Sequence, residues 1–179
     1  MISAFPSINH HLYADDTQIY VGLTPENFNS SIIHLQECLS AVQSWMINNK
    51  LKLNPDKTEF LLVGTKQQQA NLSHLFPVDI LGNSFNPGTK VKNLGVVFDS
   101  SLSFSQQVSS VCRSCYYHIR DFTRIRRYLS RSVAITLANA LVSSRLDYCN
   151  SLLLSLTKKE TLRLQRVQNT LCHRVTRLP

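Results

Sequence analysis

The sequence predicts an α+β protein, in which a small antiparallel sheet with one packed helix is followed by an all-helical region. In residues 1–102, short alternating apolar segments end at Gly, Pro, Asn or Asp, which is typical of strands. One long segment with helical periodicity lies among them, and from residue 103 to residue 179 the apolar spacing is helical throughout. We therefore predict a mixed domain at 1–102 and a basic helical domain at 103–179.

The first expected element is a β-hairpin with an acidic turn. Two apolar arms, Ile8 to Tyr13 and Ile19 to Val21, flank the adjacent carboxylates Asp15 and Asp16. Adjacent aspartates repel each other, and a divalent cation would explain the pair, because Mg²⁺ takes carboxylate oxygens and keeps positions for waters and phosphates. An Asx-type turn that serves the backbone alone is the alternative, and the pair by itself leaves both open.

A helix is expected over residues 25–48. Thr24 suits the N-cap, Pro25 the first helical position, and Asn48-Asn49 a stop. Its apolar face follows alternating steps of four and three, widened by Ile33 and Trp45, and consists of Phe28, Ile32, Leu35, Leu39, Val42 and Met46.

Further strands are expected between this helix and residue 100. Residues 51–54 and 59–63 suit two short strands around a turn with Lys57 at its tip, and residues 66–75 suit a surface loop. Residues 77–82 are expected to pair with 90–99 as a second hairpin.

The helical region combines an apolar face with a dense arginine cluster. The face consists of Val108, Val111, Cys112, Cys115 and Ile119. The arginines, which have three tyrosines nearby, are Arg120, Arg124, Arg126, Arg127 and Arg131. Arginines with aromatic side chains suit phosphate contacts and base stacking, and a solvated basic face is the alternative.

Two later helices are expected beyond the arginine cluster. Ser130 can cap one that carries Val133, Leu137, Ala140 and Leu141. Residues 157–160 form a capping box for a last helix that carries Leu162, Leu164, Val167, Leu171 and Val175.

Charge is distributed unevenly along the chain, whose formal net charge is +8. Residues 1–100 hold six Lys/Arg and eight Asp/Glu, whereas residues 101–179 hold thirteen and three. An acidic front beside a basic back suits a carboxylate metal site next to a polyanion-binding module.

Composition also narrows the compartment and the kind of protein. Five dispersed cysteines suit a reduced intracellular protein, in the nucleus or the cytoplasm, and Cys112-x-x-Cys115 lacks a second ligand pair at zinc spacing. No run of 18 apolar residues and no secretory signal is visible, so we expect no membrane partner.

Three segments resemble reverse transcriptases. Tyr13-Ala14-Asp15-Asp16 resembles their Tyr/Phe-x-Asp-Asp box, and the run from His11 to Tyr20 resembles that box in non-LTR, LINE-type retrotransposons of the jockey-like group. Residues 51–63 are similar to the next palm motif of that family, and residues 93–102 to its Leu-Gly-Val-x-x-Asp-x-x-Leu segment. Residues 144–151 and 164–169 look like the helical tail that follows the palm.

The resemblance implies a partial polymerase palm followed by a thumb-like region. It implies that Asp15 and Asp16 bind the catalytic Mg²⁺, with Mn²⁺ as an alternative, and that Lys57 protonates the pyrophosphate leaving group. It places Tyr13, Ala14, Leu94 and Gly95 near the primer end or the nucleotide. The implied partners are an RNA template and a DNA primer.

The resemblance also implies parts that this sequence does not contain. Only twelve residues precede Tyr13, whereas the family places a further aspartate strand and the fingers upstream of this hairpin. We therefore expect a C-terminal palm and thumb-like fragment that does not polymerise alone, unless the missing half acts in trans. A non-catalytic nucleic-acid-binding remnant and a purely structural or unexpressed gene fragment are the alternatives.

Overall fold

The computed structural model describes residues 2–54 and 57–176, which divide into two compact units at Thr89 and Lys90. The sequence places its domain boundary later, at 102 and 103, and the palm and thumb-like assignments stay predictions. Where one small sheet was expected, the described residues form three separate two-stranded antiparallel sheets.

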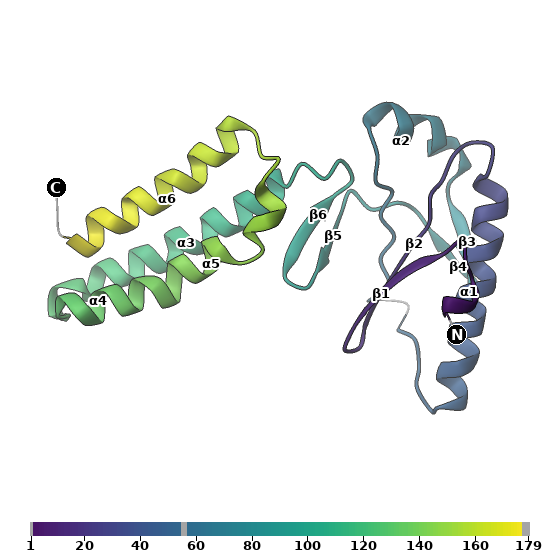
Figure 1. Cartoon of the computed structure of the whole chain (residues 1–179), viewed down its shortest axis with the longest axis horizontal. Helices are drawn as coiled ribbons and strands as arrows, with labels where there is room; N and C mark the ends of the chain where they lie inside the picture. Colours follow the sequence, from purple (N-terminus) through teal and green to yellow (C-terminus); the bar gives the residue numbers. More distant parts are fainter. Residues whose placement is uncertain (1, 55–56, 177–179) are drawn as a thin grey trace. The chain divides into compact units, whose positions relative to one another are not determined.

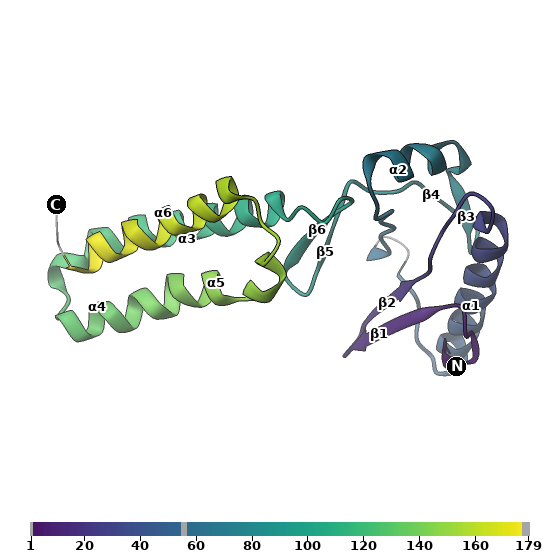
Figure 2. The same ribbon diagram turned by 45° about the horizontal axis from the view of Figure 1, so that its top comes forward.

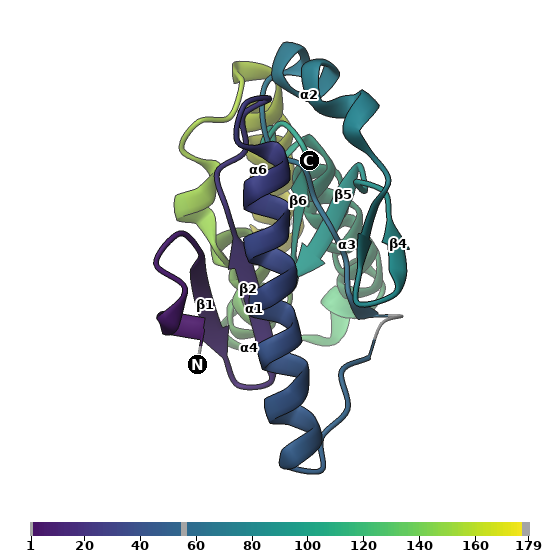
Figure 3. The same cartoon turned by 90° about the vertical axis from the view of Figure 1, so that its right-hand side faces the viewer.

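The first unit places a hairpin and short segments beside one long helix (Figure 1). Its described elements, where η marks a short 3₁₀ segment, are η1 (Ile2–Ala4), β1 (Asn9–Tyr13), β2 (Asp16–Tyr20), α1 (Phe28–Asn48), α2 (Lys66–Leu72), η3 (Ser73–Leu75), β3 (Val78–Ile80) and β4 (Asn83–Phe85). Ile8 and Ile19 pack with Leu35, Cys38 and Val42, so that α1 lies against the hairpin (Figure 3).

Helix α1 starts later than the sequence predicts. Thr24 does not cap it, because Thr24 and Asn27 instead form a turn in which each backbone N–H bonds to the other's side chain. The helix begins at Phe28 with Asn27 as its N-cap residue. It ends as predicted at Asn48, although the left-handed residue after it is Lys50, with φ of 60°.

The buried face of α1 is narrower than predicted. Phe28, Ile32, Leu35 and Val42 are buried as expected, and Cys38 joins them. Ile33 and Trp45, which were expected to widen this face, are exposed.

The segment between α1 and β3 corrects two predictions. No strand forms at 51–54 or 59–63 within the described residues, where Leu61 makes only an isolated bridge to Gly88. The turn predicted at Pro55 and Asp56 lies outside the described residues. The expected loop at 66–75 contains α2, because Thr65 and Gln68 form a capping box that starts a helix.

The predicted second hairpin is in fact two hairpins. β3 pairs with β4, and β5 (Lys90–Asn93) pairs with β6 (Val96–Asp99). Each has a Leu-Gly turn with both residues at positive φ, 52° and 76° for Leu81 and Gly82, and 46° and 81° for Leu94 and Gly95. Positive φ at both central residues is the turn that matches the twist of two-residue hairpins.

The second unit joins the β5–β6 hairpin to a helical bundle. Its helical elements are α3 (Ser105–Ile125), η4 (Arg126–Tyr128), α4 (Arg131–Ala138), the π-helical turn η5 (Asn139–Ser143), α5 (Ser144–Asp147), η6 (Asn150–Leu153) and α6 (Lys158–Thr176). Figure 2 shows α3, the α4–α5 run and α6 side by side. The buried face of α3 contains Val108, Cys112, Cys115 and Ile119, as predicted.

The two later helices bury faces that the sequence predicts only in part. Ser130 caps α4 as expected, but the buried residues along α4–α5 are Ala134, Ala138, Val142 and Leu146, and Val133 is exposed. Two alanines on this face let the helix backbones approach closely. On α6, Val167 and Leu171 are buried as predicted, whereas Leu162 is exposed.

Asp99 connects β6 to the start of α3. Its Oδ1 accepts hydrogen bonds from the Ser101 N–H and hydroxyl (3.1 and 2.8 Å) and the Ser103 N–H (2.9 Å). Its Oδ2 accepts from the Ser103 hydroxyl (3.1 Å) and the buried Phe104 N–H (2.8 Å). Burial by itself raises the pKa of Asp99, but these hydrogen bonds outweigh burial and hold the pKa below its usual value.

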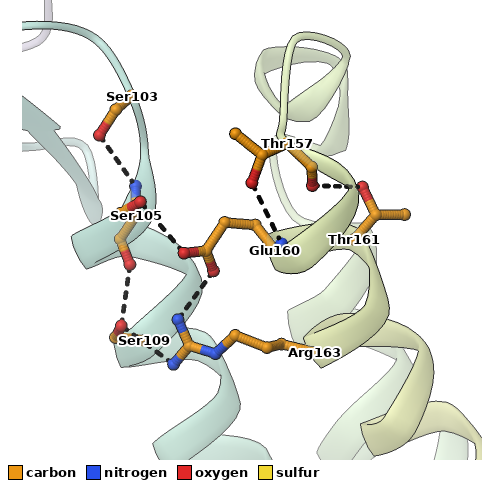
Figure 4. A network of polar contacts seen from close by, with 7 residues as sticks. All are labelled: Ser103, Ser105, Ser109, Thr157, Glu160, Thr161 and Arg163. Carbon is orange, nitrogen blue, oxygen red and sulfur yellow. Dashed lines mark hydrogen bonds and ion pairs between the residues drawn. The ribbon is translucent and has the colours of Figure 1, made fainter.

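Glu160 joins the starts of α3 and α6 (Figure 4). The Thr157 hydroxyl accepts from the Glu160 N–H at 3.4 Å, which is half of the predicted capping box. The Glu160 carboxylate instead reaches α3, where it accepts from the Ser105 hydroxyl at 3.1 Å, and it pairs with Arg163 at 2.7 Å. Arg163 also donates to the Ser109 hydroxyl at 3.1 Å, so the network closes across the two helices.

Candidate functional site

The β1–β2 hairpin presents the two predicted metal carboxylates. Tyr13 lies opposite Asp16 in the register, so Ala14 and Asp15 form a two-residue turn. Ala14 has φ of 52°, a conformation that favours glycine and costs an alanine roughly 1 kcal/mol. Tyr13, Asp15 and Asp16 are all exposed, and cross-strand partners share a face, so the Tyr13 ring and the Asp16 carboxylate lie on the same side of the hairpin.

The hairpin has two carboxylates, Asp15 and Asp16, that could bind a cation. Among the described residues, no group of three or more His, Cys, Asp or Glu side chains is placed to hold a metal ion. Mg²⁺ is often bound by one or two carboxylates, with waters and substrate phosphates completing its octahedron. Asp15 and Asp16 therefore fit a hydrated Mg²⁺ in their donor chemistry, and they do not form a closed site by themselves.

Lys57 has 3₁₀ conformation, and it does not lie at the tip of a hairpin because no strand forms at 51–54 or 59–63 in the described residues. Its backbone N–H donates to the Asn54 carbonyl at 3.2 Å, and its side chain is exposed. Within the described chain it makes no hydrogen bond or ion pair to Asp15 or Asp16, so the structure does not bring the three predicted catalytic residues together.

Leu94 and Gly95 form the turn of the β5–β6 hairpin. The Tyr148 hydroxyl donates to the Leu94 carbonyl at 2.6 Å, which ties this turn to the end of α5. A Cβ at Gly95 would meet the Tyr148 ring at an ordinary 3.6 Å, so a lack of space does not require a glycine at this position. The glycine is favoured by its φ of 81° instead.

Four of the five arginines that were predicted to contact nucleic acid are on the surface. Arg120 lies over the Tyr117 ring at 5.2 Å, and Arg127 lies over the Tyr128 ring at 4.7 Å. Arg124 pairs with Asp121 at 3.5 Å, and the side chains of both are exposed. Arg131 is exposed at the first position of α4. Exposed arginines beside tyrosine faces suit phosphate contact with base stacking.

Arg126 is the exception, because it holds the bundle together. It is buried, and its Nε and Nη2 donate to the Val175 carbonyl at 3.0 and 2.7 Å, while Nη1 donates to the Leu129 carbonyl at 3.1 Å. A guanidinium committed in this way to the last turn of α6 is a structural group. Arg126 follows Ile119 and Phe122, two buried residues of α3, at steps of three and four along the helix, and this spacing could have indicated from the sequence that Arg126 is buried.

The comparisons with known proteins give one finding. The family model described as reverse transcriptase (RNA-dependent DNA polymerase) matches residues 1–98. The chain belongs to this family. No curated protein and no solved structure matches the chain.

The family match covers part of the candidate site. It includes the β1–β2 hairpin with Asp15 and Asp16, Lys57, and the Leu94-Gly95 turn. The surface arginines lie beyond residue 98, outside the matched range. Family membership therefore implies nucleic-acid substrates for the first hundred residues. No helix in the described chain has the length and apolar character that a membrane span needs.

Proposed function

We propose that this chain is a fragment of an RNA-directed DNA polymerase from a non-LTR retrotransposon of the LINE type. The observation that carries the proposal is the sequence Tyr13-Ala14-Asp15-Asp16 at an exposed two-residue turn, inside the range that matches the reverse transcriptase family. The similarity of residues 51–63 and 93–102 to LINE-type motifs supports the subtype. An RNA template and a DNA primer are the proposed partners.

The proposed chemistry is nucleotidyl transfer with Mg²⁺, or Mn²⁺, held by Asp15 and Asp16. Two bound divalent cations would activate the primer hydroxyl and neutralise the triphosphate. Tyr13 shares a face with Asp16 and is exposed, so its ring is available to contact the primer end. The ammonium of Lys57 would offset charge on the pyrophosphate and donate its proton there.

We further propose that these 179 residues do not polymerise alone. A two-metal site needs more carboxylate ligands than Asp15 and Asp16 supply, and the described residues place no third acidic, histidine or cysteine ligand beside them. The further ligand would come from a longer chain or from a second polypeptide in trans. The free state of all five cysteines supports an intracellular location.

Metal binding at the hairpin tests the proposal without requiring activity. Mn²⁺ added to the isotope-labelled chain should broaden the amide signals of residues 13–17 more strongly than all others. The double variant Asp15→Asn/Asp16→Asn should abolish this broadening, and Asp79→Asn, an exposed carboxylate of β3, should leave it unchanged. Equal broadening at Asp79 and at the hairpin would contradict a specific site.

Primer extension on an RNA template with Mg²⁺ tests competence. We expect no extension by the chain as given. Extension that the double aspartate variant loses would show that the polymerase assignment is right and that the predicted incompetence is wrong.

A non-catalytic nucleic-acid-binding protein is the second candidate function. The two exposed arginine–tyrosine pairs favour it, because they need no metal. Binding of RNA or DNA that falls steeply with salt, is insensitive to chelator and is lost in Arg120→Gln/Arg127→Gln would support it.

A further inference from the structure

The second unit contains a pocket that borders the Leu94-Gly95 turn and is lined by charged and polar side chains of three elements. Its volume is about 410 Å³, and it lies between the β5–β6 hairpin, α3 and α5. The side chains that matter for its chemistry are Lys92 from β5, Gln107, Ser110 and Ser114 from α3, and Arg145 from α5. Tyr148 closes one wall by its hydrogen bond to the Leu94 carbonyl, so the wall is fixed before any ligand arrives.

Gln107 lines this pocket and carries an amide donor group. The residue is only 6% exposed, and its Oε1 accepts from the Val97 N–H at 3.0 Å. That bond fixes the amide orientation, because an N–H donor needs the oxygen and leaves the NH₂ group on the other side. Nε2 has no partner within the described chain, and no fully buried nitrogen there lacks one. The Nε2 group is therefore accessible to solvent, on a residue that lines the pocket.

The other polar side chains of the lining are cationic or hydroxylic, and Gly95 and Val111 complete it. Lys92 and Arg145 approach from different elements, and neither forms an ion pair among the described residues. Ser110 and Ser114 are one helical turn apart, so their hydroxyls share a face of α3. The lining contains no carboxylate. Two cations, an amide N–H pair and two hydroxyls form a donor set that matches the oxygens of a phosphate.

We propose that this pocket binds a phosphate group. The source is either a nucleic acid, through its backbone or a terminal phosphate, or a free phosphate ion. Where the source is a nucleic acid, the assignment rests on the proposed function and adds a second contact surface to it. The pocket itself belongs wholly to the second unit, so its chemistry does not depend on the aspartates of the first.

The direct test follows the Gln107 side-chain amide signals of the full chain by NMR during titration with inorganic phosphate. We expect these signals to shift and to saturate. Lys92→Gln/Arg145→Gln, two exposed positions, should weaken phosphate binding about tenfold or more, since each bond removed is charge-assisted. Gln107→Glu keeps the acceptor for the Val97 N–H but places a carboxylate in the pocket, and it should weaken binding as well.

The control variant removes the same two positive charges from positions of the second unit that lie outside the pocket. Lys158→Gln/Arg166→Gln changes two exposed cations of α6 that do not line the pocket. It should bind phosphate as the parent chain does. Unmoved Gln107 signals, or an equal loss of binding in this control, would overturn the proposal.

Oligonucleotides then identify the source. A shift of the Gln107 signals by a 5′-phosphorylated oligonucleotide, and not by its 5′-hydroxyl form, assigns a terminal phosphate. A shift by both assigns the backbone, and a shift by inorganic phosphate alone assigns a free ion. A failure of the phosphate proposal can be told apart from a failure of the proposed function. The first is measured by the Gln107 signals, and the second by Mn²⁺ broadening of the signals of residues 13–17.

Discussion

Replacing Asp99 with alanine should loosen the whole second unit. The carboxylate accepts hydrogen bonds from three backbone N–H groups and two hydroxyls between the end of β6 and the start of α3. Phe104, the residue before α3, has φ of 55° and no side-chain cap of its own. Asp99 therefore performs the capping that this helix start otherwise lacks.

The expected loss in the free energy of unfolding depends on which of the hydrogen-bond donors freed by Asp99→Ala can bond to water instead. Ser101 and Ser103 are exposed, so their donors can turn to solvent, whereas Phe104 is buried and its N–H would stay unpaired. One unpaired buried N–H costs about 1–3 kcal/mol, and loss of a helix cap costs about 0.5–2 kcal/mol. We expect a loss of about 2–4 kcal/mol in the free energy of unfolding.

Hydrogen exchange by mass spectrometry separates this unit from the other. Amides of α3 that exchange through opening of the unit should exchange roughly 30- to 900-fold faster in Asp99→Ala. Peptides from α1, which belongs to the first unit, serve as an internal reference.

The control is Asp121→Asn on the same helix, whose exposed ion pairs are worth at most about 1 kcal/mol. If α3 exchanges no faster in Asp99→Ala than in Asp121→Asn, the capping role assigned to Asp99 is refuted.

Three further predictions concern the second unit. The native pKa of Asp99 lies below its ordinary value of 3.8, so the stability that its carboxylate gives the second unit should persist above pH 4 and be lost as the pH falls towards the native pKa. Hydrogen exchange of the α3 amides, followed as the pH is lowered, would show this loss. The same pH profile in Asp99→Ala would contradict the prediction. Arg126→Ala should cost about 2–3 kcal/mol in thermal unfolding, against less than about 1 kcal/mol for Arg127→Ala, and equal costs would contradict the structural role of Arg126. Gly95→Ala should cost about 1 kcal/mol because of its positive φ, whereas Gly22→Ala, in open space, should be neutral or stabilising, and the same cost at both would contradict the conformational argument.

The elements that the sequence predicted well are those stabilised by local pattern. The β1–β2 hairpin and helices α1, α3 and α6 follow from alternation or from helical spacing, which the final packing preserves. The two Leu-Gly turns were missed because leucine at positive φ is uncommon, so residues 90–99 resembled one strand and Leu81-Gly82 resembled the end of another. Strands at 51–54 and 59–63 were predicted from a short alternating segment and an apolar run around turn residues, and such a local pattern forms no ladder without a partner strand.

The residues of the candidate site could be named from the sequence, but their arrangement in space could not. The turn aspartates lie where the hairpin pattern put them, but no hydrogen bond or ion pair links Lys57 to them in the described chain. Arg126 was grouped with the surface arginines by charge, although its spacing from Ile119 and Phe122 continues the buried stripe. Gln107 carried no signal in the sequence, since its importance depends on the Val97 N–H and on a pocket that three separate elements form.

The side chains of Asp15 and Asp16 are exposed at a turn and make no hydrogen bond or ion pair within the described chain, so these two carboxylates stabilise no contact of the first unit. Asp99, Arg126 and Glu160, in contrast, are buried and bonded. Selection for a folded protein alone would thus retain these three and let the two aspartates drift. An inactive relative of this chain would therefore keep the architecture long after the aspartates had changed, and an intact aspartate pair in a relative would indicate selection on chemistry, or too little time for the pair to decay.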